Sequence, residues 1–228
     1  MLEPFKPRDY YVRELELDPD RPFAFLMKHT SLCASADSPE AVQAALDAML
    51  RVPLLKEEYH AHFGFPLVTA ECLDRLHILL RDKHVLDAGS GTGFLAQALA
   101  ERDISVVAAD NQDQNYGFQA VYRRDSSQDA ADLLPGTFTA VLLSWPCAMS
   151  DFAFRVANAM SAGALLVYQG EGPGGATAAH DFFALTRDWP RDDEASTALN
   201  AMHAQFAGIK DRWTVMMKPA GTPDRVAL

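Results

Sequence analysis

Short hydrophobic runs alternate with longer segments of helical periodicity from residue 83 onward. The runs have the length and residue types of strands, and 138–143, which has no polar face, indicates a strand buried on both sides. The predicted strands are 84–88, 105–109, 120–123, 138–143, 164–168 and 212–217. Because strands alternate with helices, we expect an α/β fold in which a mostly parallel sheet carries helices on both faces.

The segment before residue 83 is predicted to be helical. Ser38 is a favourable N-cap and Pro39 suits the first helical position, so a helix should begin here, and Pro53 should end it. A second helix is expected over 54–62, and Thr69 should cap a third one directly before the first strand.

These patterns divide the chain into four parts. At 228 residues it has room for one sizeable α/β core and an extension. We expect an irregular arm over 1–37, a helical cap over 38–82, the α/β domain over 83–218 and a loose tail over 219–228.

A glycine-rich turn follows the first predicted strand. Gly89, Gly91 and Gly93 come directly after it, and Asp110 stands nineteen residues after Gly91, at the end of the second strand. Glycines allow a sharp turn and a close approach of a ligand to backbone N–H groups, and an acid at this place can accept the hydroxyls of a ribose. The pattern predicts a nucleotide-like ligand over the strand ends.

The glycine spacing narrows the choice of ligand. A dinucleotide fingerprint needs its third glycine at position 94, where Phe94 stands, and no Gly-Lys-Ser/Thr follows that would form a phosphate loop. With Asp87 before Gly89, Gly91 and Gly93, the turn resembles the first motif of class I S-adenosylmethionine-dependent methyltransferases. The resemblance implies a Rossmann-like methyltransferase domain over 83–218 and S-adenosyl-L-methionine as cofactor.

The resemblance also implies which residues meet that cofactor. Asp87 would fix the glycine turn or reach the cofactor through water, the turn would line the methionine and ribose, and Asp110 would accept the ribose hydroxyls. Asp125 would accept from the adenine amino group, although it could instead belong to a helix cap with Ser126. The implied cofactor residues are Asp87, Gly89, Ser90, Gly91, Gly93, Phe94, Asp110, Asn111, Asp125, Ser144 and Trp145.

The turn after the fourth predicted strand bears on the acceptor. Amino-methylating members of the superfamily carry Asp/Asn/Ser-Pro-Pro-aromatic there, whereas this chain has Trp145 in place of the first proline and Cys147 in place of the aromatic residue. The departures argue against amino methylation. Trp145 could stack on a ligand or be a core indole whose N–H is paired, and Cys147 is expected in the wall of a pocket.

The strand ends supply candidates for orienting or deprotonating an acceptor. We expect Ser144, Tyr168 and Glu171 to have this role, because all three stand at or near the carboxyl ends of predicted strands. The segment after the fifth predicted strand, 170–175, is rich in glycine, and Thr177 should cap the helix that follows.

Residues 59–217 are also similar to a scarcely characterised group within the superfamily. The matching segments are 63–66, 145–146, 170–171 and 174–177, with Cys147 and Ala176 as departures. In methyltransferases of this type, an N-terminal addition commonly covers the cofactor. The cap over 38–82 would therefore be a lid, or it would only complete the core. The group points to no particular acceptor.

Charge and cysteine content exclude some partners. A net charge of −11 and a pI near 5.0 argue against a broad surface for nucleic acid. Cys33, Cys72 and Cys147 lack the spacing of a zinc site, and His60 with His62 has no evident third ligand, so no metal is expected. Without a long apolar run or a signal-peptide core, we expect a cytoplasmic protein with no membrane partner.

The function predicted from sequence is methyl transfer from S-adenosylmethionine to a small molecule or a protein side chain. A non-catalytic S-adenosylmethionine sensor or partner-binding module is the main alternative. A nucleic-acid amino-methyltransferase is a third, which the net charge and Cys147 both disfavour.

Overall fold

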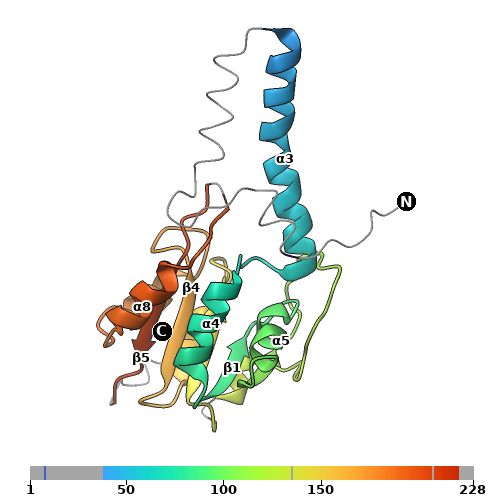
Figure 1. Cartoon of the computed structure of the whole chain (residues 1–228). Coiled ribbons are helices and arrows are strands. Elements are labelled where there is room, and N and C mark those ends of the chain that lie inside the picture. The colour runs from blue at the N-terminus through green and yellow to red at the C-terminus, as the bar shows by residue number, and fades with distance from the viewer. Residues whose placement is uncertain (1–7, 9–37, 135, 207, 221–228) are drawn as a thin grey trace.

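A computed structural model describes residue 8 and residues 38–134, 136–206 and 208–220 (Figure 1). The arm expected over 1–37 and most of the expected tail therefore lie outside the described residues. The helices are α3 (Pro39–Phe63), α4 (Ala70–Leu80), α5 (Phe94–Ala100), the 3-10 helix η1 (Ala130–Leu133), α6 (Phe152–Ala159), α7 (His180–Thr186) and α8 (Asp193–Asn200). The strands are β1 (His84–Ala88), β2 (Ser105–Ala109), β3 (Ala140–Ser144), β4 (Leu165–Gly170) and β5 (Arg212–Met217).

Five strands form one sheet in the order β2-β1-β3-β4-β5. The first four are parallel, and β5 runs antiparallel to β4, so the mostly parallel sheet predicted from sequence is confirmed. The chain moves outward from β1 to β2 and then returns to build β3 and β4 on the other side. This doubly wound, Rossmann-like arrangement places a topological switch point between β1 and β3.

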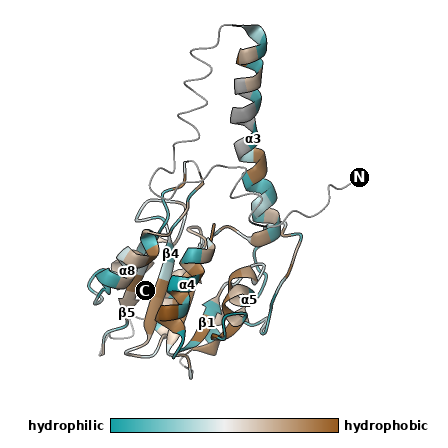
Figure 2. Cartoon of the chain, in the orientation of Figure 1, coloured by the Kyte–Doolittle hydropathy of each residue, from teal (hydrophilic) through white to brown (hydrophobic). Residues whose placement is uncertain are grey.

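Helices cover both faces of the sheet because its strands are apolar on both sides. The helices α4, α5 and α8 pack on one face, around Leu76, Leu99 and Leu199. On the other face, η1, α6 and α7 enclose a second cluster that includes Val156 and Phe182. Figure 2 shows the hydrophobic colour along much of β4 and on part of α4, whereas α8 is mostly hydrophilic in colour. The layers leave the carboxyl ends of the strands as the place for a site.

The strand predicted over 120–123 is wrong, because side chains take its place along the edge of β2. The Arg123 guanidinium donates to the carbonyl of Val106, and the Asp125 carboxylate accepts from the N–H of Ala108 at 2.8 Å. Beyond them only a single bridge forms, between Ala109 and Ser126. The edge groups of β2 are thus paired without a sixth strand among the described residues.

The predicted break at Pro53 is also wrong, since α3 continues through it to Phe63. Proline inside a helix costs about 3 kcal/mol, but the turns beyond it bury an apolar stripe at four-residue spacing. Leu55, Tyr59 and Phe63 form this stripe, which packs against Phe206 and its neighbours. Tertiary packing therefore outweighs the local penalty. In Figure 1, α3 projects away from the sheet, and its C-terminal end lies against the domain.

The other helix starts before the sheet agree with the sequence. The Ser38 hydroxyl accepts from the N–H of Ala41, and the Thr69 hydroxyl accepts from the N–H of Cys72, both at 3.2 Å. No helix within the described ranges is long and apolar enough to cross a membrane.

Gly93 generates a prediction about stability. Its φ is +70°, and a Cβ built there would stand 1.8 Å from the carbonyl oxygen of Arg123. That backbone has little freedom to move, because the N–H of Tyr122 donates to the carbonyl of Thr92 at 2.7 Å. We expect Gly93→Ala to lower the free energy of unfolding by clearly more than the ~1–2 kcal/mol that a left-handed backbone costs alanine.

The matched control is Gly163→Ala, with φ +80° and no atom within 4 Å of the added Cβ. Urea denaturation of both variants measures the difference. Equal losses of stability would contradict the steric role of Gly93.

Candidate functional site

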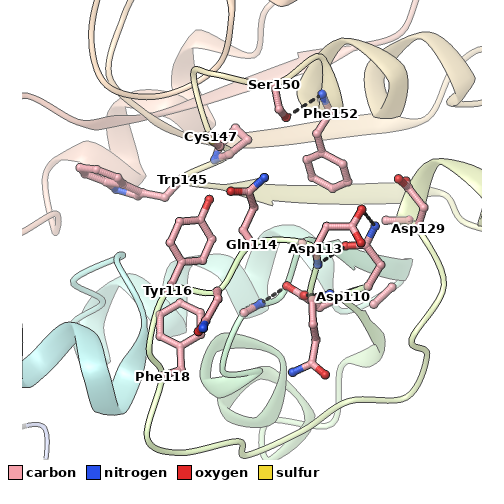
Figure 3. Close-up of a pocket in the computed structure, with 18 of the residues that line it drawn as sticks. Asp110, Asp113, Gln114, Tyr116, Phe118, Asp129, Trp145, Cys147, Ser150 and Phe152 are labelled. Carbon is pink, nitrogen blue, oxygen red and sulfur yellow. Dashed lines mark hydrogen bonds between the residues drawn. The ribbon is translucent and has the colours of Figure 1, made fainter.

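A cavity of about 530 Å³ opens at the carboxyl ends of β1, β2 and β3, at the switch point. Segment 109–118 forms one wall, and the turn 145–152, which leads from β3 into α6, forms the other. Figure 3 shows the side chains of these two segments facing each other across the space. The sheet topology therefore places the cavity where doubly wound folds bind their ligands.

The glycine turn and the acid after β2 are joined in the cavity wall. The N–H of Gly91 donates to Asp110 Oδ2 at 2.7 Å, and the N–H of Gly89 donates to the carbonyl of Ala109 at 2.9 Å. Asp110 Oδ1 accepts a further bond from the N–H of Gln112 at 2.8 Å. A carboxylate has about four acceptor positions, so Asp110 keeps the capacity to accept from a ligand.

The structure brings only part of the predicted cofactor set to the cavity. The predicted residues that line it are Gly89, Gly91, Asp110, Asn111 and Trp145. The predicted residues outside the lining are Asp87, Ser90, Gly93, Phe94, Asp125 and Ser144. Gly93 begins α5 under the turn, and Phe94 packs its ring on Phe63 at 5.1 Å.

Asp87 and Ser90 lie just behind the lining with unsatisfied polar atoms. Asp87 is 2% exposed, and neither its Oδ2 nor the hydroxyl of Ser90 has a hydrogen-bond partner within the described structure. Burial, together with the nearby charge of Asp110, raises the pKa of Asp87 to about 7, against a smaller effect of the N–H of Ala96. Buried groups of this kind are costly without a partner.

Asp129 lines the cavity, whereas Asp125, which was predicted to meet the cofactor, does not. Asp125 is held by Ala108 and by Arg123, whose Nε lies 2.7 Å from Asp125 Oδ2. Asp129 Oδ1 accepts from the N–H of Ala131, and Oδ2 accepts from Arg155 at 2.8 Å.

Asp129 also caps the short helix η1, where the sequence leaves a cap with Ser126 open. Burial alone would raise the pKa of Asp129, but the bonds from Arg155 and Ala131 hold it below its usual value. The short helix is capped by Asp129, not by Ser126. The sequence does carry a signal for this cap, because an acid stands directly before the alanine pair 130–131.

Trp145 lines the cavity, half-buried, and its indole N–H is paired; its stacking on a ligand stays a prediction. Nε1 donates to Asp211 Oδ2 at 2.8 Å, and the indole lies 6.0 Å from the ring of Phe65 at an interplanar angle of 21°. Its φ of +52° is rare for a bulky residue. Cys147 also lines the cavity, which confirms its expected place in a pocket wall.

The Trp145 indole belongs to a buried polar network that sequence reasoning missed. Asp211 is 2% exposed, and besides the indole it pairs with His203 Nε2 at 3.0 Å and accepts from Gln169 Nε2 at 3.3 Å. Gln169 in turn accepts from the hydroxyl of Ser144 at 2.7 Å. No short motif marks these residues, since they come from four separate segments.

The three residues predicted to act on an acceptor are not in the lining. Ser144 bonds to Gln169, as above. The hydroxyl of Tyr168 donates to the carbonyl of Glu171 at 2.8 Å, and burial raises its pKa to about 12. The Glu171 carboxylate accepts from the N–H groups of Ala176 and Lys210, at 2.7 and 3.0 Å. Their catalytic role stays a prediction.

The helix cap expected at Thr177 is wrong. Helix α7 begins at His180, after Ala179, and has no side-chain cap bond. The Thr177 hydroxyl accepts instead from the N–H of Glu171 at 2.7 Å, which closes the loop after β4. Thr177 is 1% exposed, and its hydroxyl also lies 2.8 Å from the hydroxyl of Tyr168, so its hydrogen bonds are used within the loop.

Segment 112–118 contributes much of the cavity wall and was not assigned a role from sequence. Its Tyr116 and Phe118 rings contact Phe65 at 5.1 and 5.9 Å, and the N–H of Gln119 donates to the carbonyl of Ala61 at 2.7 Å. The end of α3 therefore supports the segment that borders the cavity. The available signal was the polar run that directly follows Asp110.

The histidine pair at 60 and 62 shows no metal centre. Across the described ranges, no three His, Cys, Asp or Glu side chains are grouped as metal ligands would be. His60 packs against Phe65 and Phe206, at 5.0 and 5.4 Å. Burial, with a contribution from Lys56, lowers its pKa to about 4, so His60 is uncharged at neutral pH, half-buried among these rings at the end of α3.

Comparisons with known proteins add little to this description. No family model and no curated protein matches the chain. Among solved structures, TehB from Haemophilus influenzae is 10% identical over 72% of this chain and 67% of that one, with a TM-score of 0.45. A SAM dependent methyltransferase from Archaeoglobus fulgidus is 13% identical over 64% of this chain and 91% of that one, with a TM-score of 0.44.

A third structure is the 1,6-didemethyltoxoflavin-N1-methyltransferase of Burkholderia thailandensis, with 1,6-didemethyltoxoflavin and S-adenosylhomocysteine bound. It is 18% identical over 81% of this chain and 93% of that one, with a TM-score of 0.41. The fold class follows from the sheet itself, with its order β2-β1-β3-β4-β5 and a single antiparallel strand.

The buried Asp87 generates a prediction about pH. Because its folded pKa of about 7 lies above the usual 3.8, the folded protein binds a proton that the unfolded chain releases between these pH values. Its contribution to stability therefore falls as pH rises through this window and stays low above it. We expect Asp87→Asn to melt higher than the wild type at pH 8, with the gain shrinking toward pH 4.

For a chain of this size, each kcal/mol of relieved charge burial raises Tm by about 2–4 °C. Thermal unfolding at pH 4, 6 and 8 measures the effect. Asp82→Asn is the control, since that side chain is 87% exposed. A gain for Asp87→Asn that did not change with pH would show that charge burial is not its cause.

Proposed function

We propose that the protein binds S-adenosyl-L-methionine in this cavity and transfers its methyl group to a small molecule or a protein side chain. The observation that carries the proposal is the position of Asp110. Its carboxylate stands at the end of β2, is bonded to the Gly91 N–H of the turn after β1, and lines the cavity at the switch point. An acid so placed can accept two adjacent ribose hydroxyls.

The residues behind the lining suit a ligand with polar groups. Asp87 Oδ2 and the Ser90 hydroxyl are buried without partners in the described structure, and both lie beside the glycine turn. A Cβ at Gly89 would stand 3.0 Å from the ring of Phe152, and one at Gly91 3.1 Å from the ring of Phe118. Glycine at both positions lets these rings approach the turn closely, where a larger residue would push them away.

Each wall of the cavity then has a function. Asp110 would hold the ribose, Gly89 and Gly91 would lie along the methionine, and Asn111, which lines the cavity, would meet the adenosine. The cofactor supplies a methyl group activated by a sulfonium. The indole of Trp145 would stabilise a cation near its face, and the walls would align the acceptor with the methyl carbon.

A sensor that binds S-adenosylmethionine without turnover is the second candidate. It is favoured by the bonding of Ser144, Tyr168 and Glu171, whose side chains are all engaged within the protein and lie outside the cavity lining. Catalysis by positioning alone needs none of the three. Their bonding therefore weakens the case for their catalytic roles more than the case for methyl transfer itself.

Cofactor binding gives the first test of the proposal. We expect isothermal calorimetry to show binding of S-adenosylmethionine but not of NAD. Asp110→Ala should abolish it. Asp110→Asn keeps an oxygen for the Gly91 N–H but loses the charge, and should weaken binding by about 10- to 100-fold. Asp82→Asn, on the exposed surface, should bind as the wild type does. Wild-type protein that bound neither ligand would contradict the proposal.

Turnover gives the second test. With small-molecule and peptide extracts as acceptors, wild-type protein should form S-adenosylhomocysteine, and Ser144→Ala and Glu171→Gln should each lower the rate. A tenfold loss corresponds to about 1.4 kcal/mol of transition-state stabilisation. Glu194→Gln, in the exposed first turn of α8, is the control. Unchanged rates would remove both residues from the mechanism, and cofactor binding without any product would favour the sensor.

A further inference from the structure

We propose that the end of the cavity beside Trp145 is an acceptor site for a flat, uncharged ring compound. The inference rests on the proposed function, because it takes the Asp110 side as the place of the cofactor. It adds the chemical class of the second ligand, which neither the glycine turn nor the sheet topology indicates.

The two ends of the cavity differ in chemistry. Figure 3 shows Tyr116, Phe118 and Trp145 gathered at one end, whereas Asp113 and Asp129 lie toward the other. The charged end is further marked by Arg155, which pairs with Asp129 at 2.8 Å and with Asp151 at 3.0 Å. A charged ligand group would find its partners at that end, and an apolar ring would be better accommodated at the aromatic end.

The aromatic end is already organised as a wall. Phe65 backs the indole of Trp145 in a nearly parallel arrangement, with an angle of 21° between the rings. Tyr116 stands edge-on to Phe65 at 87° and lies 5.6 Å from Phe118. Rings held in this way offer a large apolar surface and lose little conformational freedom when a flat ligand stacks on them.

The buried network fixes the direction of the indole. Trp145 has a left-handed backbone with φ +52°, which a bulky residue keeps only where its surroundings impose it. The surroundings here are the Asp211 carboxylate on the indole N–H and the carbonyl of Gln169 on the backbone N–H, at 2.8 Å each. With its N–H turned to Asp211, the indole contributes only ring surface to the cavity.

The polar groups at this end are suited to an uncharged ligand. Burial raises the pKa of Tyr116 to about 12, with a contribution from its contact with Cys147, so its hydroxyl stays neutral and places no charge beside the ligand. An oxygen on the bound ring would form a bond to the methyl carbon as the carbon–sulfur bond breaks. The bonding pair stays on sulfur, and the proton of the acceptor passes to water.

The test uses 2-naphthol as the probe, with the full chain labelled with 5-fluorotryptophan. The protein has three tryptophans, and Trp145→Phe identifies the ¹⁹F resonance of Trp145. We expect 2-naphthol to shift that resonance in a saturable way and to leave those of Trp189 and Trp213 in place. Two probes serve as controls: decahydro-2-naphthol, which is not flat, and naphthalene-2-sulfonate, which is charged. Each should bind at least about tenfold more weakly than 2-naphthol.

Tyr116 provides a matched pair of variants, and its 43% exposure makes loss of folding a small concern. Tyr116→Leu removes the ring and should weaken 2-naphthol binding about tenfold, whereas Tyr116→Phe keeps the ring and should bind within about twofold of the wild type. No saturable shift at Trp145, equal binding of the three probes, or equal effects of the two variants would each overturn the proposal.

Calorimetry with S-adenosylmethionine on the same samples separates the two proposals. Cofactor binding without naphthol binding would overturn the ring site and leave the proposed function standing. Naphthol binding without cofactor binding would leave a ring-binding site but overturn its assignment to a methyl acceptor.

Discussion

The hydrogen bond from the Gly91 N–H to Asp110, 2.7 Å long, is the contact on which the candidate site depends. It joins the turn after β1 to the end of β2, the two neighbouring strands on one side of the switch point. The bond needs a glycine turn that approaches the acid closely, and that turn needs Gly93, because the Arg123 backbone occupies the space of a side chain there. Local backbone geometry thus sets the position of the one carboxylate expected to select the cofactor.

The opposite wall is positioned from farther away. Trp145 lies at the cavity because Asp211, from the segment before β5, accepts its indole N–H, and because Phe65, from the segment after α3, covers one side of its ring. The antiparallel pairing of β5 with β4 brings Asp211 to Gln169 and the turn after β3. The site therefore combines one wall built from adjacent strand ends with another that requires the whole sheet and the end of α3.

The sequence predictions failed where a nonlocal contact outweighed a local preference. Pro53 did not end α3, because the aromatic and aliphatic stripe beyond it is buried. The segment 120–123 did not pair as a strand, because the side chains of Arg123 and Asp125 already bond the edge of β2. In each case the residue types were read correctly, but the partner that decided their structure lies elsewhere in the chain.

The sequence by itself determined the strands of the sheet, the glycine turn and its spacing to Asp110. These depend on apolar runs and on backbone conformations that only a few residue types adopt. Only the tertiary structure decided that Asp129 lines the cavity while Asp125 does not, and that His203 and Asp211 support Trp145. These contacts depend on which side chains meet after the sheet has formed. Because the partners are far apart in the chain, no pattern of neighbouring residues encodes them.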